Sequence, residues 1–257
     1  MSPSLKPFLD QLKLRAPLDD DAQRIILSLD FEVQEMGREQ ALIQHGETPK
    51  RICVIADGVA ARCGRTLEGS RQITAIHVSG DMPGLPSLML PSAGFSLCTL
   101  TKSRLLWVNR SELKQAARHP QIMEAFWRLA LVDLAIAWEW EVNIGRRPAE
   151  KRVAHLVCEL ACRMNALARP GCAFQLGLTQ QQFADSCGIS VVHANRCFQA
   201  LRRERLLEAK GDWIAIADWD RLAEWAEFDD AYLHRAGTGL STGWAGGQSV
   251  SAPAATI

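Results

Sequence analysis

The residues from 178 to 207 constrain the fold of this chain more than any other stretch. Thr179 offers the hydroxyl of a helix N-cap, and Gln182 follows at the spacing of a capping box. Gly188 suits the left-handed C-cap of that helix, and Ser190 suits the N-cap of a second helix. Two short capped helices joined by a tight turn that contains glycine predict a helix–turn–helix.

The second of these helices has two chemically different faces. Its apolar stripe consists of Ala194, Cys197, Phe198 and Leu201. Its opposite face carries His193, Asn195, Arg196, Gln199, Arg202 and Arg203. Asn and Arg side chains make bidentate contacts with adenine and guanine edges, so this face predicts base readout in a major groove.

A hairpin follows the two helices. Residues 207–216 alternate around the turn Lys210-Gly211-Asp212. Helix, turn, helix and hairpin in this order are typical of a winged helix, and DNA binding is the favoured interpretation. A winged helix that binds another protein instead of DNA is the alternative. An enzyme is not favoured, because no carboxylate is paired with His or Cys at a spacing that suggests acid–base or nucleophilic catalysis.

The charge distribution supports a DNA contact in this part of the chain. The net charge is zero, with 29 basic and 29 acidic residues. Residues 146–210 nevertheless contain 11 basic and 5 acidic residues, whereas residues 211–257 contain 2 basic and 7 acidic ones. The basic segment coincides with the predicted helices, as expected for a surface that contacts phosphates.

The predicted DNA-binding surface combines expected base contacts with expected phosphate contacts. The surface consists of Thr179, Gln180, Ser190, His193, Asn195, Arg196, Gln199, Arg202 and Arg203. We expect Arg196, Asn195 and His193 to contact bases. Thr179 and Gln180 begin a helix, where free N–H groups favour phosphate. Arg202 and Arg203 are expected at the DNA backbone.

The N-terminal part of the chain predicts a β-rich domain. Residues 5–29 are typical of one or two short helices. Short strand-like runs follow at 31–33, 41–43, 51–63, 71–78, 95–101 and 105–108, and residues 111–118 predict a closing helix. Many short strands separated by glycines indicate an antiparallel barrel or sandwich.

A long helix with two apolar rows is predicted from Pro120 to Asn143. One row comprises Ile122, Phe126, Leu129, Ile136 and Trp140, and the other comprises Trp127, Leu131, Leu134 and Trp138. A helix that is apolar on two sides must be buried on two sides. We expect one row to pack against the β-rich domain and the other against a second copy, with Phe126, Leu129, Ile136 and Trp140 as the dimer contacts. Gly145 is expected to end this helix, and Pro148 to begin another that reaches Ala166.

The predicted organisation is α+β with four segments. They are a sensor domain at 1–119, a dimerisation helix at 120–145, a winged helix at 146–235 and a disordered tail at 236–257 rich in Gly, Ser, Ala and Thr. No apolar run approaches the roughly 20 residues of a membrane span, and the N-terminus has no signal-peptide pattern. We therefore expect a cytoplasmic protein without a membrane partner.

The eight cysteines do not form a Cys-x-x-Cys pair, so zinc-ribbon spacing is absent. His155, Cys158 and Cys162 share one helical face and could hold a metal ion. Cysteine as a small buried side chain is the favoured interpretation, and we expect neither metal nor cofactor.

The order of β-roll, long helix and winged helix resembles the Crp/Fnr superfamily of bacterial transcription regulators. The stretches that carry the resemblance are His45-Gly46-Glu47, 52–59, 68–73, 78–81, 147–159, 178–181 and 218–222. The resemblance implies a cyclic-nucleotide-binding-like β-roll, a homodimer on double-stranded DNA and contact with RNA polymerase.

This chain departs from that pattern where the family binds its effectors. Cyclic-nucleotide-binding members have a Gly-Glu pair and an Arg-Ser/Thr pair, but the matching stretches here contain Gly84-Leu85-Pro86 and Gly94-Phe95-Ser96. The first cysteine is Cys53, so the N-terminal iron–sulfur cluster of the oxygen-sensing branch is absent. His77 as a haem ligand is less favoured than His77 as a strand residue. We expect an unknown small-molecule or redox effector and no binding of cyclic nucleotide.

Overall fold

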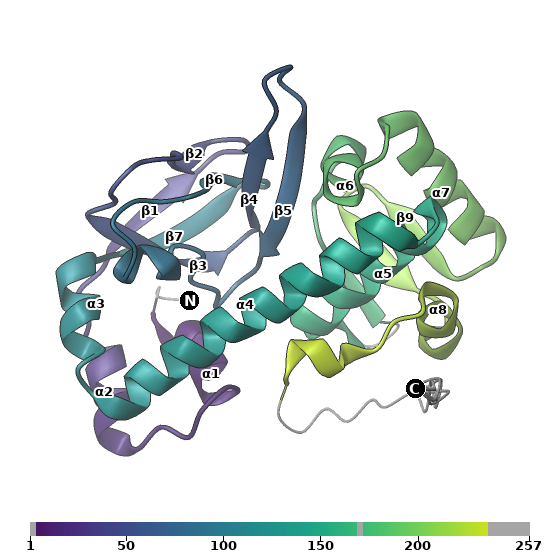
Figure 1. The fold of residues 1–257 in the computed structure, drawn as a ribbon. Helices are drawn as coiled ribbons and strands as arrows, with labels where there is room; N and C mark the ends of the chain where they lie inside the picture. The colour runs from purple at the N-terminus through teal and green to yellow at the C-terminus, as the bar shows by residue number, and fades with distance from the viewer. Residues whose placement is uncertain (1–3, 169–171, 236–257) are drawn as a thin grey trace, which may run out of the picture.

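The computed structural model describes residues 4–168 and 172–235. Figure 1 shows a β-roll with helices at its base, a smaller helical unit with its own sheet, and one long helix that runs along both. An antiparallel sheet domain, a long helix and a helix–turn–helix unit confirm the predicted α+β class. The predicted disordered tail, residues 236–257, lies outside the described residues.

The β-roll consists of two antiparallel sheets, with strand orders β1-β7-β3 and β2-β6-β4-β5. The strands are β1 (Glu32–Met36), β2 (Ala41–Ile43), β3 (Arg51–Asp57), β4 (Ala60–Arg65), β5 (Arg71–His77), β6 (Ser96–Thr99) and β7 (Ser103–Asn109). Cys53 and Ile55 of β3 face the interior of the roll, where they pack with Leu97. Ile52 and Val54 alternate with them and face the helices at the base.

The predicted run 51–63 forms two strands because Gly58 turns the chain between them. Gly58 has a φ of +91°, and a Cβ atom there would lie 2.4 Å from Ser103 Oγ. Both the backbone conformation and the close approach require glycine at this position. The turn places β3 in one sheet and β4 in the other.

Helices close the base of the roll. They are α1 (Lys6–Lys13), α2 (Asp20–Leu27) and α3 (Arg110–Ala116), with the 3-10 helix η1 (Leu85–Leu88) between β5 and β6. Asp19 caps α2 by accepting a 2.8 Å hydrogen bond from the Ala22 amide. Phe8 and Ile26 are fully buried in a cluster that also contains Phe126 of the long helix.

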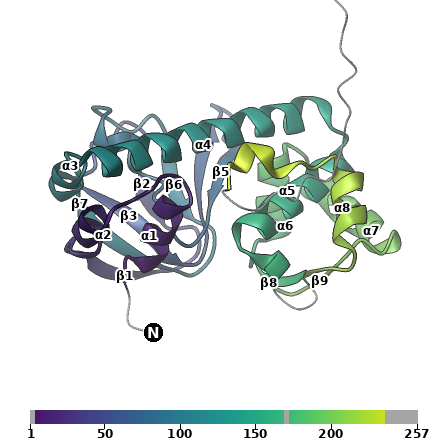
Figure 2. The same cartoon turned by 90° about the horizontal axis from the view of Figure 1, so that it is seen from below.

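The long helix α4 (Pro120–Arg146) continues through Gly145, so the predicted end at Asn143 is wrong. Glycine is tolerated inside a helix, whereas the residue before a proline is disfavoured in the helical region. Arg147 precedes Pro148 and is extended, and this ends α4. The next helix, α5 (Ala149–Arg163), ends three residues before the predicted Ala166. Figure 2 shows α4 along one side of both bodies.

The C-terminal unit is a winged helix. It contains α6 (Gln180–Cys187), α7 (Val191–Arg203), α8 (Trp219–Ala226) and the 3-10 helix η4 (Asp230–Leu233). Its sheet has the order β8-β10-β9, from β8 (Ala173–Gln175), β9 (Leu207–Lys210) and β10 (Trp213–Ile216). Strand β8 was not predicted. One cluster of buried side chains joins this unit to β4, β5 and the second half of α4.

Candidate nucleic-acid interface

The helix–turn–helix has the caps that the sequence predicts. Thr179 Oγ1 accepts from the Gln182 amide at 3.2 Å, and Gln182 Oε1 accepts from the Thr179 amide at 2.9 Å. Gly188 ends α6 with a φ of +62°, and Ser190 Oγ accepts from the His193 amide at 3.2 Å. These local hydrogen bonds fix where α7 begins, and therefore which of its side chains face outward.

The outward face of α7 matches the predicted set. His193, Arg196, Gln199, Arg202 and Arg203 are exposed, and Asn195 is partly buried. The inner face is closed by an edge-on contact between Phe183 and Phe198, whose ring centroids are 4.9 Å apart. Aromatic packing of this kind holds α7 firmly against α6 while its polar face stays in solvent.

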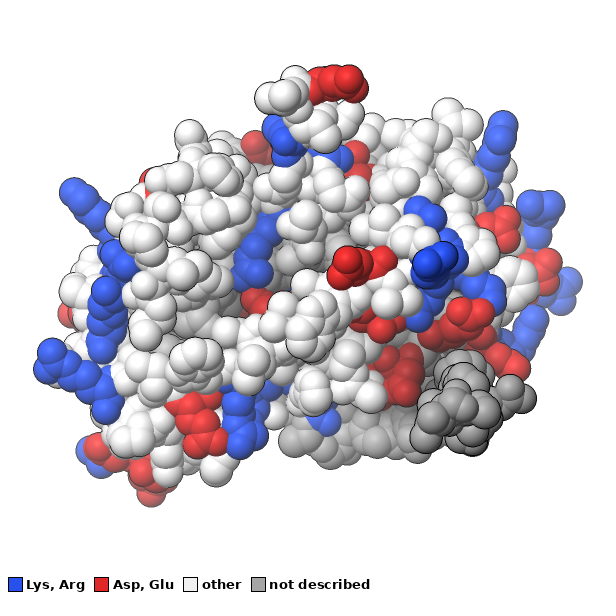
Figure 3. All heavy atoms as spheres, viewed as in Figure 1, with Lys and Arg blue, Asp and Glu red and all other residues white. Residues whose placement is uncertain are grey.

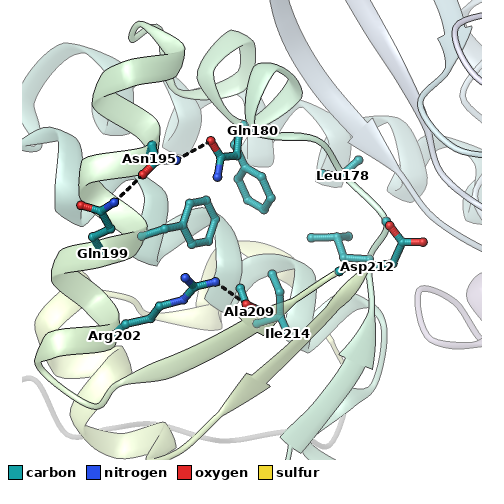
Figure 4. A pocket seen from close by; sticks show the side chains of 13 residues that line it. Leu178, Gln180, Asn195, Gln199, Arg202, Ala209, Asp212 and Ile214 are labelled. Carbon is teal, nitrogen blue, oxygen red and sulfur yellow. Dashed lines mark hydrogen bonds between the residues drawn. The ribbon is translucent and has the colours of Figure 1, made fainter.

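Three amide side chains form a chain of hydrogen bonds across the two helices (Figure 4). Asn195 Nδ2 donates to Gln180 Oε1 at 2.9 Å, and Gln199 Nε2 donates to Asn195 Oδ1 at 2.8 Å. Gln180 thus positions the Asn195 amide, although sequence reasoning gave Gln180 a phosphate contact alone. Gln199 retains its own amide oxygen as a hydrogen-bond acceptor.

A hollow of about 300 Å³ lies between α6, α7 and the hairpin. Its lining includes Leu178, Gln199 and Asp212. Arg202 crosses it and donates to the main-chain carbonyl of Ala209 on β9. Arg202 therefore holds the hairpin against α7. The neighbouring Arg203 is also exposed.

Sequence reasoning missed two apolar side chains on this surface. Val192 in the first turn of α7 is 64% exposed, and Trp213 on β10 is 51% exposed. Val192 lies next to His193, a predicted base contact, and Trp213 lies directly opposite Lys210 across the hairpin. The sequence did offer a signal for both: each is an apolar residue at a position expected to face solvent, one in the first turn of the second helix and one beside the hairpin turn.

Charged side chains are distributed unevenly over the C-terminal unit. Figure 3 shows Lys and Arg side chains along the edge of the molecule where α7 lies. Acidic side chains lie near α8 in the same view, and acidic and basic side chains lie together beside the last turns of α4. A phosphate backbone would therefore be attracted to the edge that carries α7 and repelled from the adjoining face.

The two apolar rows of α4 are reversed relative to the prediction. Phe126, Ile136 and Trp140 are buried in the protomer's own core, and Leu129 is partly buried against it. The exposed row consists of Trp127, Leu131, Leu134, Trp138 and Val142. Assigning the first row to a partner was wrong because the β-roll and α5 already cover it.

The segment where the family binds cyclic nucleotide is filled by the chain's own side chains. Leu85 is 7% exposed and packs in the cluster at the base of the roll. Arg62 donates to the Pro83 carbonyl at 2.8 Å and to Asp133 Oδ2 at 2.7 Å, and its guanidinium lies over the Phe95 ring. Asp133 is an acidic residue of α4, and this ion pair holds its carboxylate against the β-roll.

The histidines and cysteines considered as ligands are packing residues here. His155, Cys158 and Cys162 are buried, and His155 Nε2 lies 3.2 Å from Glu139. Burial raises the pKa of the Cys162 thiol to about 12, which disfavours a thiolate ligand. His77 is buried beside Asp81, and burial lowers its pKa. Within residues 4–168 and 172–235, no three His, Cys, Asp or Glu side chains are grouped to hold a metal ion.

A β-roll followed by a long helix and a winged helix defines a two-domain class of DNA-binding transcription regulators. The model of the cyclic nucleotide-binding domain matches residues 33–119, and the model of the Crp-like helix–turn–helix domain matches residues 151–225. The chain belongs to the Crp/Fnr family.

Its relatives are transcription regulators. The transcriptional activator protein FnrL of Cereibacter sphaeroides is 24% identical over 196 residues, which cover 74% of this chain and 78% of the relative. The nitrogen fixation regulation protein FixK of Azorhizobium caulinodans is 27% identical over 170 residues, covering 65% and 68%. The solved structure of FixK2 from Bradyrhizobium japonicum is similar in fold, with a TM-score of 0.70 at 23% identity, over 77% of this chain and 98% of that one. In the part of the chain that the structure describes, no helix combines the length and the apolar character that a membrane span needs.

Proposed function

We propose that this regulator is a homodimer that reads a near-palindromic operator with α7 in the major groove. The observation that carries the proposal is the pair of capped helices, because the caps leave the polar face of α7 in solvent beside a basic edge. Two copies related by a twofold axis would contact half-sites about one helical turn apart, roughly 34 Å.

The exposed row of α4 supports the dimer. Trp127, Leu131, Leu134 and Trp138 are separated by four, three and four residues, which is the alternation of a heptad seam. A contiguous exposed apolar stripe on a folded chain marks an interaction surface. A second copy of α4 fits it best, because the same stripe from the partner is complementary to it across a twofold axis.

Base and phosphate contacts are assigned from position on α7. Arg196 is exposed early in the helix and suits guanine O6 and N7. Asn195 and His193 supply further base contacts, and Val192 suits a thymine methyl group. The remaining predicted residues, Thr179, Gln180, Ser190, Gln199, Arg202 and Arg203, would contact phosphate or support the others.

The β-roll is proposed not to bind cyclic AMP or cyclic GMP. Leu85 cannot accept a ribose hydroxyl proton, and Arg62 is already paired with Asp133. Losing one charge-assisted contact costs about 1.5–3 kcal/mol, so two losses leave little specific affinity. RNA polymerase and an effector of another kind remain predicted partners.

Selection of bound sequences from random DNA tests the central claim. The expected result is an enriched motif with twofold symmetry. A wild-type protein that enriches no sequence at low salt, yet captures a protein partner through the winged helix, would favour the protein-binding alternative.

A further inference from the structure

Two cysteines lie side by side on the face of the β-roll that packs against the winged helix. Cys63 belongs to β4 and Cys98 to β6, and their Sγ atoms are 3.6 Å apart in a thiol–thiol hydrogen bond. Cys63 is almost fully buried, whereas Cys98 is partly exposed. Cys98 is therefore the more accessible of the two residues to a small oxidant, and its sulfur is already in contact with that of Cys63.

The strand register places the two cysteines diagonally. Cys63 pairs with Ser96 and Cys98 pairs with Ala61, so both thiols project from the same face of neighbouring strands. Diagonal neighbours have Cα atoms about 7–8 Å apart. A relaxed disulfide needs about 4.4–6.8 Å, so bond formation must draw β4 and β6 together. A disulfide under such strain is more readily reduced than a structural one.

The neighbouring residues connect this pair to α6. Arg71 on β5 forms an ion pair with Asp185 of α6 at 2.7 Å and another with Glu39. Gln182 of α6 donates to Glu39 at 2.6 Å and to the Leu100 carbonyl at 3.0 Å. Arg71 lies on a strand of the same sheet as the two thiols, and Leu100 directly follows β6, so movement of β4 against β6 changes the surface against which α6 packs.

We propose that Cys63 and Cys98 form a reversible disulfide, generated by a peroxide and removed by a thiol reductant, that loosens the contact between the β-roll and α6. The disulfide and its effect on α6 do not depend on DNA. Only the consequence for operator affinity rests on the proposed function.

The local chemistry favours Cys98 as the attacking thiolate. The hydrogen bond with the Cys63 thiol lowers the pKa of Cys98 in spite of burial, while the charges of Glu39 and Arg71 act in opposite directions, Glu39 raising it and Arg71 lowering it. The Cys98 thiolate attacks one peroxide oxygen, the O–O bond breaks, and hydroxide leaves and is protonated to water. The Cys63 sulfur, losing its proton, then attacks the Cys98 sulfenic acid and expels a second water. Reduction by two thiols returns both protons and leaves the reductant as its disulfide.

Peroxide treatment of the full-length protein tests the disulfide. After hydrogen peroxide, alkylation of free thiols and peptide mapping should recover a Cys63–Cys98 crosslink that dithiothreitol removes. The rate of amide hydrogen exchange in α6 should then rise about tenfold or more in the oxidised protein, because the packing of α6 against the sheet is disturbed. C63S and C98S should show neither change, and C172S, which alters a partly exposed cysteine elsewhere, should behave as the wild type.

Two outcomes would overturn the inference: no Cys63–Cys98 crosslink in the wild type, or a crosslink with unchanged exchange in α6. Operator affinity, measured in parallel, should differ about fivefold or more between the two redox states. Sequence-specific DNA binding without a crosslink would refute the switch and leave the proposed function intact. A crosslink that loosens α6 in a protein without sequence-specific DNA binding would refute the proposed function and leave the switch intact.

Discussion

Truncating one tryptophan of the exposed α4 row should separate the proposed dimer. Trp138 is 59% exposed in the protomer, and a tryptophan can bury up to about 250 Å². About 150 Å² of Trp138 is thus available to a partner, and Trp138→Ala would remove roughly 100 Å² of it from each subunit. At about 25 cal/mol per Å², the loss over two subunits is about 5 kcal/mol as an upper bound.

Association converts only part of this area into affinity. A loss of half of this upper limit, about 2.5 kcal/mol of association free energy, would still raise the dimer dissociation constant about 50-fold or more. Sedimentation velocity over a range of concentrations measures this change. Trp213→Ala is the matched control, because Trp213 is 51% exposed but lies on β10 of the hairpin.

A substitution in the buried row of α4 distinguishes the role of that row from the role of the exposed row. Ile136 is 6% exposed and belongs to the protomer core, so Ile136→Ala should lower the free energy of unfolding by about 2–5 kcal/mol. Its dimer dissociation constant should change far less than that of Trp138→Ala. The reasoning is refuted if Trp138→Ala associates as strongly as the wild type, or if the wild type is monomeric on its selected DNA site.

Three further results are expected. Arg196→Ala should weaken DNA binding by about 1–3 kcal/mol and relax the preference at one base pair. Arg203→Ala should instead weaken binding to all DNA sequences alike and reduce the dependence of affinity on salt concentration. Binding curves at two salt concentrations distinguish the two results. Burial alone would raise the pKa of Asp81, but Arg163 and His77 hold it at about 2, below its usual 3.8. The stabilisation from this carboxylate is therefore present above about pH 4 and is lost as the pH falls toward 2, and Asp81→Asn should flatten that part of a urea-denaturation profile against pH. Calorimetric titration with cyclic AMP or cyclic GMP should show no binding at micromolar concentrations.

The sequence predicts the helix–turn–helix well because its signals are local. Thr179 with Gln182, Gly188 and Ser190 each act within one helical turn of the boundary that they define. Hydrogen bonds of that range need no knowledge of the rest of the fold. The outward set on α7 follows from those boundaries by helical periodicity alone.

The orientation of α4 could not be predicted in the same way. Both of its rows are apolar, so periodicity shows that two faces are buried without showing which face meets which partner. The choice depends on residues far away in the sequence, such as Arg62, whose ion pair with Asp133 fixes that side of α4 toward the β-roll. The contact between Cys63 and Cys98 was missed for the same reason, because it depends on the pairing of β4 with β6.

Two arginine–carboxylate pairs hold the winged helix to the β-roll directly, and both are largely shielded from solvent. Arg71 reaches Asp185 on α6, and Arg163 of α5 reaches Asp81 at 2.8 Å. Breaking such a pair leaves a partly buried charge without its partner, which costs more than an exposed pair contributes. These ion pairs, together with the buried cluster that joins the two units, set the orientation of α7 relative to α4. The thiols of Cys63 and Cys98 lie near enough to Arg71 for its charge to act on both, and β4, which carries Cys63, pairs with β5, which carries Arg71, so a displacement of β4 against β6 is transmitted toward the contact with α6.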